Sequence, residues 1–215
     1  MKHIGILFLT ILLSLMTSLF SSAQSFTDPR EKFQFGLKAG ANYANMYDSE
    51  EEGFEAEGKF GVVGGFFMAI PIGKFLGIQP EVIFSQKGFK QTGSFLGGTY
   101  ELTRTTDYFD VPLFLSIKPS RFLTVQLGPQ LSFLTRQKDV FTNALATIED
   151  ETFFKNENIR KNTVCAVGGV DIHLQQVVVG FRAGLDLQNN NGGGTSTNPR
   201  YKNAWVQGTL GFQIF

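Results

Sequence analysis

Alternation of apolar and polar residues is clearest across residues 160–187. In residues 164–174 every second residue is apolar or glycine, and after Gln175 and Gln176 the same alternation resumes over residues 177–187. A period of two is the pattern of a β-strand whose two faces meet different surroundings. The segment therefore predicts two long strands joined by a tight turn, that is, a β-hairpin.

The same period recurs in six other parts of the chain. The strands that it predicts cover approximately residues 33–45, 59–70, 76–87, 100–117, 123–133 and 204–214. With the hairpin, the predicted strands number eight. Abundant glycine and phenylalanine, with a single tryptophan, also favour β structure over helix.

The predicted connections alternate strictly between long and short. The long, polar ones lie around residues 47–58, 88–99, 137–161 and 189–200, and the short ones around 71–75, 118–121 and 175–176. An even strand number with short periplasmic turns and long outer loops is typical of bacterial outer-membrane barrels. We therefore predict an all-β fold, an eight-stranded antiparallel transmembrane up-and-down β-barrel in the cell outer membrane.

A soluble barrel is the alternative for the same strand pattern. In a lipocalin-like protein the apolar faces point inward, and the chain would be a periplasmic binder of a hydrophobic ligand. Nothing in the physics of such a barrel requires long and short connections to alternate. The loop pattern therefore favours the membrane barrel, in which the apolar faces meet lipid and the polar faces meet the lumen.

The N-terminus predicts export. An uncharged apolar run over residues 4–20 follows Lys2 and precedes small residues that end at Ala23. This order is that of a cleaved signal peptide over residues 1–23, with an N-terminal membrane anchor as the alternative. We expect a short periplasmic lead at 24–32 and the barrel domain at 33–215, because no later apolar run reaches the ~20 residues that a membrane helix needs.

Few residues are available for reaction chemistry. After removal of the signal peptide the chain has one histidine, His173, and its one cysteine, Cys165, has no partner for an internal disulfide. The acidic residues at 48–57 match no EF-hand spacing. The formal net charge of zero gives no indication of nucleic-acid binding. We expect no cofactor and no metal, and a protein that is not an enzyme.

Polar residues on the inward parity predict a structural network. The lumen of an eight-stranded barrel is just wide enough for side chains to fill it, and charges buried there must pair. The residues expected in this network are Lys38, Glu81, Asp110, Asp171, His173, Arg182 and Asp186. Aromatic residues near the predicted strand ends are typical of girdles at the membrane interfaces. These are Tyr43, Tyr100, Tyr108, Phe122, Phe133, Tyr201 and Trp205.

Several short segments resemble one known family. Residues 35–42 (FGLKAGAN), 108–114 (YFDVPLF), 128–129 (GP), 167–172 (VGGVDI) and 180–184 (GFRAG) are similar to the PorT-like outer-membrane β-barrel family of Bacteroidetes. The resemblance extends over nearly the whole predicted barrel. It implies a small eight-stranded outer-membrane barrel, and it does not imply one particular activity.

The sequence favours a non-enzymatic barrel whose surface loops, above all 137–161, bind an envelope or extracellular partner. The other expected partners are outer-membrane lipid and, during biogenesis, the barrel-assembly machinery. A lipid-modifying outer-membrane enzyme is the second hypothesis, which the lack of a visible catalytic set disfavours. A narrow solute channel is the third, which a filled lumen disfavours.

Overall fold

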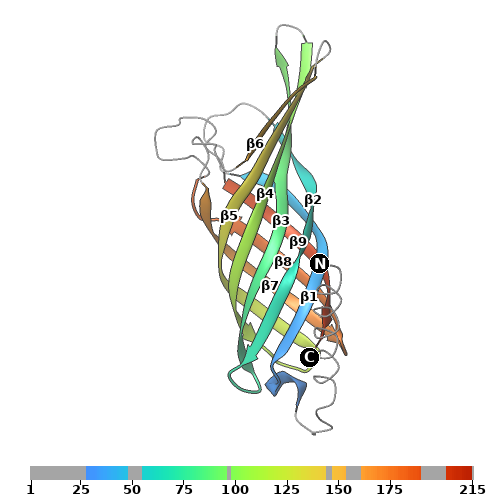
Figure 1. Ribbon diagram of the computed structural model, residues 1–215, viewed down its shortest axis with the longest axis vertical. Coiled ribbons are helices and arrows are strands. Elements are labelled where there is room, and N and C mark those ends of the chain that lie inside the picture. The colour runs from blue at the N-terminus through green and yellow to red at the C-terminus, as the bar shows by residue number, and fades with distance from the viewer. Residues whose placement is uncertain are drawn as a thin grey trace, which may run out of the picture.

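A computed structural model describes residues 28–47, 55–95, 98–143, 147–153, 161–189 and 202–214. The expected signal peptide, the start of the lead and Tyr201 lie outside these residues. The described elements are a one-turn 3-10 helix and nine strands (Figure 1). They are η1 (Pro29–Glu31), β1 (Gln34–Tyr47), β2 (Glu55–Pro71), β3 (Leu76–Phe95), β4 (Gly98–Ile117), β5 (Leu123–Asn143), β6 (Thr147–Phe153), β7 (Asn162–Leu174), β8 (Val177–Asp186) and β9 (Lys202–Gln213).

Eight of the strands close into a ring. Antiparallel pairing runs from β1 through β2, β3, β4, β5, β7, β8 and β9, and β9 pairs back with β1, where Ala41 is opposite Gly208. Closure leaves no unpaired edge in the wall, which a sheet in hydrocarbon requires. The prediction of an eight-stranded antiparallel barrel is therefore confirmed.

Apolar side chains of the wall point outward, and polar ones point inward. Leu37 and Leu113 are about half exposed on the outer surface, whereas Lys38 and Gln126 are buried inside the ring. The period-two pattern places these opposite properties on opposite faces of each strand. This orientation contradicts the soluble lipocalin-like alternative, which needs its apolar faces inside.

The short connections lie together at one end of the barrel. They are residues 72–75, 118–122 and 175–176, and β1 begins and β9 ends at the same end. Gln175 reaches a left-handed φ of 59° to close the two-residue turn. Short turns mark the periplasmic end of an outer-membrane barrel. The helix η1 lies at this end, at the bottom of Figure 1.

Two of the predicted loops are largely strand, and those predictions are wrong. Residues 88–95 continue β3 and residues 98–99 belong to β4, where we expected a loop over 88–99. Residues 137–143 continue β5 and 147–153 form β6, within the loop expected at 137–161. Apolar and polar residues do not alternate regularly along these segments. The sequence pattern that marks the wall is therefore absent from them.

The extended strands form a sheet that rises above the wall, at the top of Figure 1. We call it the blade and define it as residues 55–58, 88–95, 98–107, 136–143 and 147–153, which pair in the order β2, β3, β4, β5, β6.

The register shifts where the wall meets the blade. The pairing of β2 with β3 shifts between Gly58 and Val63, and that of β4 with β5 between Asp107 and Tyr108. Gly88 at this level has a φ of +150°, which L side chains rarely adopt. Bulges and glycines of this kind bend a sheet, so the closed wall can continue into an open blade.

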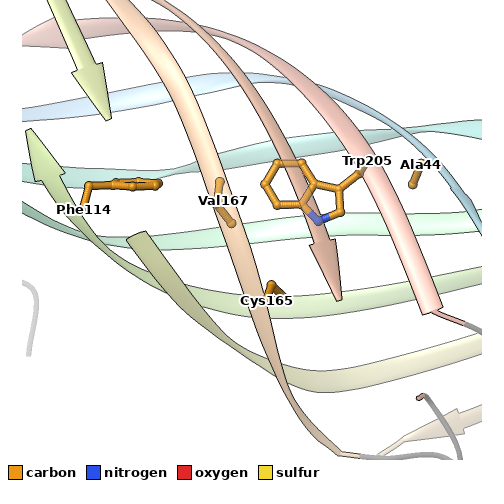
Figure 2. Packing of buried hydrophobic residues seen from close by; sticks show 5 residues of the cluster. All are labelled: Ala44, Phe114, Cys165, Val167 and Trp205. Carbon is orange, nitrogen blue, oxygen red and sulfur yellow. The ribbon is translucent and has the colours of Figure 1, made fainter. Parts of the chain in front are cut away.

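Apolar side chains also pack inside the lumen. Figure 2 shows one such group, consisting of Ala44, Phe114, Cys165, Val167 and Trp205. The expectation that Trp205 and Tyr108 lie in an interfacial girdle is wrong, because both side chains are buried inside the barrel. Their rings lie 5.1 and 4.9 Å from the Lys87 ammonium, which explains why aromatic residues occupy a polar face.

Candidate functional site

A group of charged and amide side chains fills the middle of the barrel. We call it the central lumen cluster, and its members are Lys38, Gln79, Glu81, Gln126, Asp171 and Arg182. The carboxylate of Glu81 is its hub. Glu81 Oε1 accepts from Lys38 Nζ at 2.7 Å. The Arg182 guanidinium donates to both oxygens of Glu81, at 2.6 and 2.9 Å.

Arg182 extends the cluster to the opposite wall. Its Nη2 donates to Gln126 Oε1 at 2.8 Å and lies 3.4 Å from Asp171 Oδ2. Gln126 Nε2 donates to the same oxygen of Asp171 at 3.0 Å. The guanidinium carbon lies 4.7 Å from the centre of the Phe114 ring, which covers it with apolar surface.

The central lumen cluster is electrically balanced and inaccessible to solvent. It contains two cations and two anions, and each of these four side chains is at most 4 % exposed. Charges so far from water are tolerated only when they are paired and hydrogen-bonded. Since the contacts join β1, β3, β5, β7 and β8, the side chains bridge the lumen from wall to wall.

A second group lies nearer to the blade. Lys87 Nζ is 3.2 Å from Asp110 Oδ2, and both side chains are buried. Asp186 accepts from the Cys165 thiol at 3.0 Å and from the Asn203 side-chain amide at 2.7 Å. Cys165 is therefore a buried, hydrogen-bonded group in the lumen.

His173 lies close to the periplasmic end, away from both groups. Its Nε2 is 2.9 Å from Thr124 Oγ1, and its Nδ1 is 3.2 Å from Gln213 Nε2. The structure thus separates the seven expected network residues into three levels. Lys38, Glu81, Asp171 and Arg182 meet in the centre, Asp110 and Asp186 lie above them, and His173 lies below.

Sequence reasoning left the amides out of the network. Gln79 donates to Glu81 at 2.8 Å, and Gln126 joins Arg182 to Asp171. Both lie on the inward parity of their strands, so the same period-two argument would have found them. Lys87, also on that parity, is not among the seven predicted residues, and it pairs with Asp110.

Neither a metal-binding group nor a membrane-spanning helix is present among the described residues. Among them, no group of three or more His, Cys, Asp or Glu side chains is placed to hold a metal ion. None of the helices in the same residues is long and apolar enough to span a membrane.

Ion pairs also join the strands of the blade, but they are nearer to water. Arg104 forms two hydrogen bonds with Asp139, both at 2.8 Å, and Arg136 Nε lies 2.7 Å from Asp107 Oδ2. Tyr100 stacks on Phe141 with ring centres 5.4 Å apart. The blade is thus a defined surface, held by cross-strand contacts outside the barrel wall.

One edge of the blade is formed by β6. Among the described residues β6 pairs only with β5, so no described strand covers its other side. Ile148 on this strand is 61 % exposed. An open strand edge can receive a further strand from another chain.

Solved structures with similar folds were found, at low identity. Ail, the attachment invasion locus protein of Yersinia pestis, has 8 % identity and a TM-score of 0.49, with 85 % of this chain and 99 % of Ail covered. Neisserial surface protein A has 11 % identity and a TM-score of 0.44, with coverage of 85 % and 99 %. OprG from Pseudomonas aeruginosa has 11 % identity and a TM-score of 0.37, with coverage of 84 % and 93 %. No curated protein matches the sequence.

A family model gives the stronger assignment. The model described as outer membrane protein beta-barrel domain matches residues 22–190, which is well over half of the chain. The matched region includes seven of the eight strands of the ring. It agrees with the closed wall, the outward apolar face and the outer-membrane location. The chain belongs to the outer membrane protein beta-barrel domain family.

Proposed function

We propose that this chain is a non-enzymatic outer-membrane barrel that binds an extracellular or envelope protein partner through the blade. The observation that carries the proposal is the extension of β3, β4 and β5 beyond the wall, with β6 added at the edge. The membrane wall does not need these residues. A sheet of this kind outside the bilayer provides surface for a partner, and its β6 edge provides backbone groups.

The charge of the blade favours a basic partner. Its residues include eight acidic and four basic side chains, and β6 alone carries three acidic ones. The four basic residues are Lys90, Arg104, Arg136 and Lys138, and each makes an ion pair with a blade carboxylate. With eight acidic and four basic residues, the blade sequence carries a net charge of −4, which favours a partner with a positive surface, and such binding weakens as salt rises.

Site-specific photo-cross-linking in living cells tests the proposal. A photo-reactive amino acid replaces Ile148 on the β6 edge, and a matched variant carries it at Leu127, which faces outward from the wall. We expect a discrete cross-linked protein product from position 148 and none of the same size from 127. The yield at 148 should rise at least about threefold when the medium is changed from 0.5 M to 0.05 M salt.

Equal products at both positions, or no product at 148 in cells that display the folded protein, would contradict a blade partner. Folding is checked by heat-modifiable migration on a gel. Because Ile148 and Leu127 are both exposed, neither replacement disturbs a buried contact.

The filled lumen supports a binding protein over a solute channel. The central lumen cluster crosses the barrel interior, so we expect no stable conductance in planar bilayers. Steady openings of the purified chain would favour the channel. The position of His173, hydrogen-bonded to Thr124 and Gln213 near the periplasmic end, also gives no support to a catalytic role at the outer leaflet.

The finer assignments remain proposals that rest on the sequence. They are a PorT-like origin in Bacteroidetes, a signal peptide over 1–23, a lead at 24–32 before the barrel domain at 33–215, and contact with barrel-assembly machinery and outer-membrane lipid. The N-terminal sequence of the protein purified from membranes tests the cleavage site. A start at Gln24 is expected, and retention of Met1 would contradict it.

A further inference from the structure

The periplasmic mouth of the barrel contains a cavity of about 200 Å³ whose lining includes several polar and cationic side chains. Its wall combines the lead, the turn after β4, and the periplasmic ends of β1, β5, β7 and β9. The lining residues are Pro29, Arg30, Gln34, Lys118, Ser120, Arg121, Thr124, His173, Gln175 and Gln213. A single water needs about 30 Å³, so the cavity has room for a small polyatomic ion.

The lining supplies hydrogen-bond donors and positive charge, and none of its described residues is a carboxylate. Three of its residues, Arg30, Lys118 and Arg121, are cations at neutral pH. Hydroxyl and amide side chains and an imidazole lie between them. Such a set matches an oxyanion, which accepts several hydrogen bonds and carries the opposite charge.

Among the residues that the structure describes, two of the three cations have no carboxylate partner. Arg30 is balanced by Asp28, to which it donates from Nε at 3.0 Å and from Nη2 at 2.7 Å. No carboxylate among the described residues lies within 4 Å of the Lys118 ammonium, which donates to the Arg30 main-chain oxygen at 3.0 Å. Arg121 lies over the ring of Phe122, and no described carboxylate pairs with it either.

Lys118 gives the strongest support for an anion site, because this lysine is only 4 % exposed. Burial, and to a lesser degree the nearby charge of Arg30, lower the pKa of Lys118 below its ordinary value. A buried ammonium beside a second cation is unfavourable unless an anion compensates it. Lys118, Arg30 and Arg121 all line the cavity, so an anion bound there would lie beside three cations.

We propose that this cavity binds a phosphate-type oxyanion at the periplasmic mouth of the barrel, with Lys118, Arg30 and Arg121 as its cationic ligands. The same chemistry is available from a soluble phosphate group or from the headgroup of an anionic phospholipid. The site is at the opposite end of the barrel from the blade, so it does not depend on the proposed partner.

Calorimetric titration of inorganic phosphate into the full folded chain in zwitterionic detergent tests the site. We expect saturable binding with one site per chain. Lys118→Gln should raise Kd at least about tenfold, because it removes the uncompensated cation. Lys32→Gln is the matched control. It makes the same change at the same end, on an exposed residue outside the cavity, and should leave Kd within about twofold.

Arg121→Gln gives a second variant in an exposed turn, for the case in which Lys118→Gln does not fold. It should raise Kd about threefold or more. Absence of saturable binding, or equal weakening by Lys32→Gln and Lys118→Gln, would overturn the proposal. Folding of every variant is checked by heat-modifiability.

The source of the oxyanion follows from a second titration, in nanodiscs. Phosphate is added to the chain in phosphatidylcholine alone and in phosphatidylcholine with phosphatidylglycerol. An apparent Kd that rises with phosphatidylglycerol means that the lipid headgroup occupies the site. An unchanged Kd means that the site takes soluble phosphate, and both results require the same lysine.

Discussion

Glu81 in the lumen and Glu101 in the blade are both glutamates paired with a lysine. Glu81 is fully buried, lies 2.7 Å from Lys38 and also holds Arg182. Glu101 lies 3.6 Å from Lys90, and both of these side chains are about half exposed. The lumen pair is dry and has several partners, whereas water competes for the blade pair. The same residue types therefore have different energetic importance in the two regions.

The largest expected effect comes from Glu81→Gln. It leaves Lys38 and Arg182 buried with only Asp171 to balance them, and we expect a loss of about 3–5 kcal/mol in the free energy of unfolding. Denaturant titration of the chain folded into lipid vesicles measures the loss.

Glu101→Gln makes the same chemical change in the blade, and we expect it to cost less than about 1 kcal/mol. If the two variants lose equal stability, the distinction between lumen and blade is wrong.

Substitutions on the outer faces of the wall and the blade should also differ in their cost to stability. Leu113 points outward near the middle of the wall segment of β4, where lipid surrounds it. We expect Leu113→Arg to destabilise the chain by about 2–4 kcal/mol, the cost of a cation near the bilayer midplane. Folding into vesicles at increasing urea is the measurement.

Ile148→Arg adds the same charge on the blade, at an exposed position in water. Its effect should stay within about 0.5 kcal/mol. A cost at 148 as large as that at 113 would place β6 in the membrane.

Gly88 joins the two regions, and its substitution should have an intermediate effect. A Cβ there would lie 2.1 Å from the Arg104 main-chain oxygen, on a backbone with φ of +150°. We expect Gly88→Ala to cost about 1–3 kcal/mol, and to increase hydrogen exchange in the blade more than in the wall.

Gly73→Ala is the comparison, because a Cβ at Gly73 meets nothing within 4 Å. It should leave both stability and exchange almost unchanged. Uniform exchange changes in blade and wall after Gly88→Ala would contradict the role of Gly88 as a junction.

The smallest effect is expected at the partly exposed ion pair between Asp28 and Arg30 in the lead. The hydrogen bonds from Arg30 lower the pKa of Asp28 below its ordinary value. The stabilising contribution of the ionised Asp28 carboxylate is therefore complete above a pH of about 4 and is lost as the pH falls toward the lowered pKa. The Arg30 amide signal in NMR should move toward its unfolded position below pH 4, and Asp28→Asn should show this shift already at pH 7. An Arg30 signal that is the same in wild type and Asp28→Asn at pH 7 would contradict the coupling.

Sequence alternation determined the wall of this protein. Leu113 faces outward and Gln126 faces inward, because successive side chains of a strand point in opposite directions. The short turns at 118–121 and 175–176 were readable because the alternation stops there. The period, the parity and the turn lengths together predicted the eight-stranded barrel and the charged side chains that face its lumen.

Tertiary structure decided the rest. The strands of the blade lack the regular apolar alternation of the wall, so residues 88–95 and 137–143 resembled loops. The meeting of Lys38 with Glu81 and Arg182 depends on the stagger between strands more than 40 residues apart. Strand parity places Trp205 on the inward face, but only the closed sheet brings its ring to 5.1 Å from the Lys87 ammonium. Local pattern assigns a residue to a face, but only the register of the closed sheet decides which residues meet across the lumen.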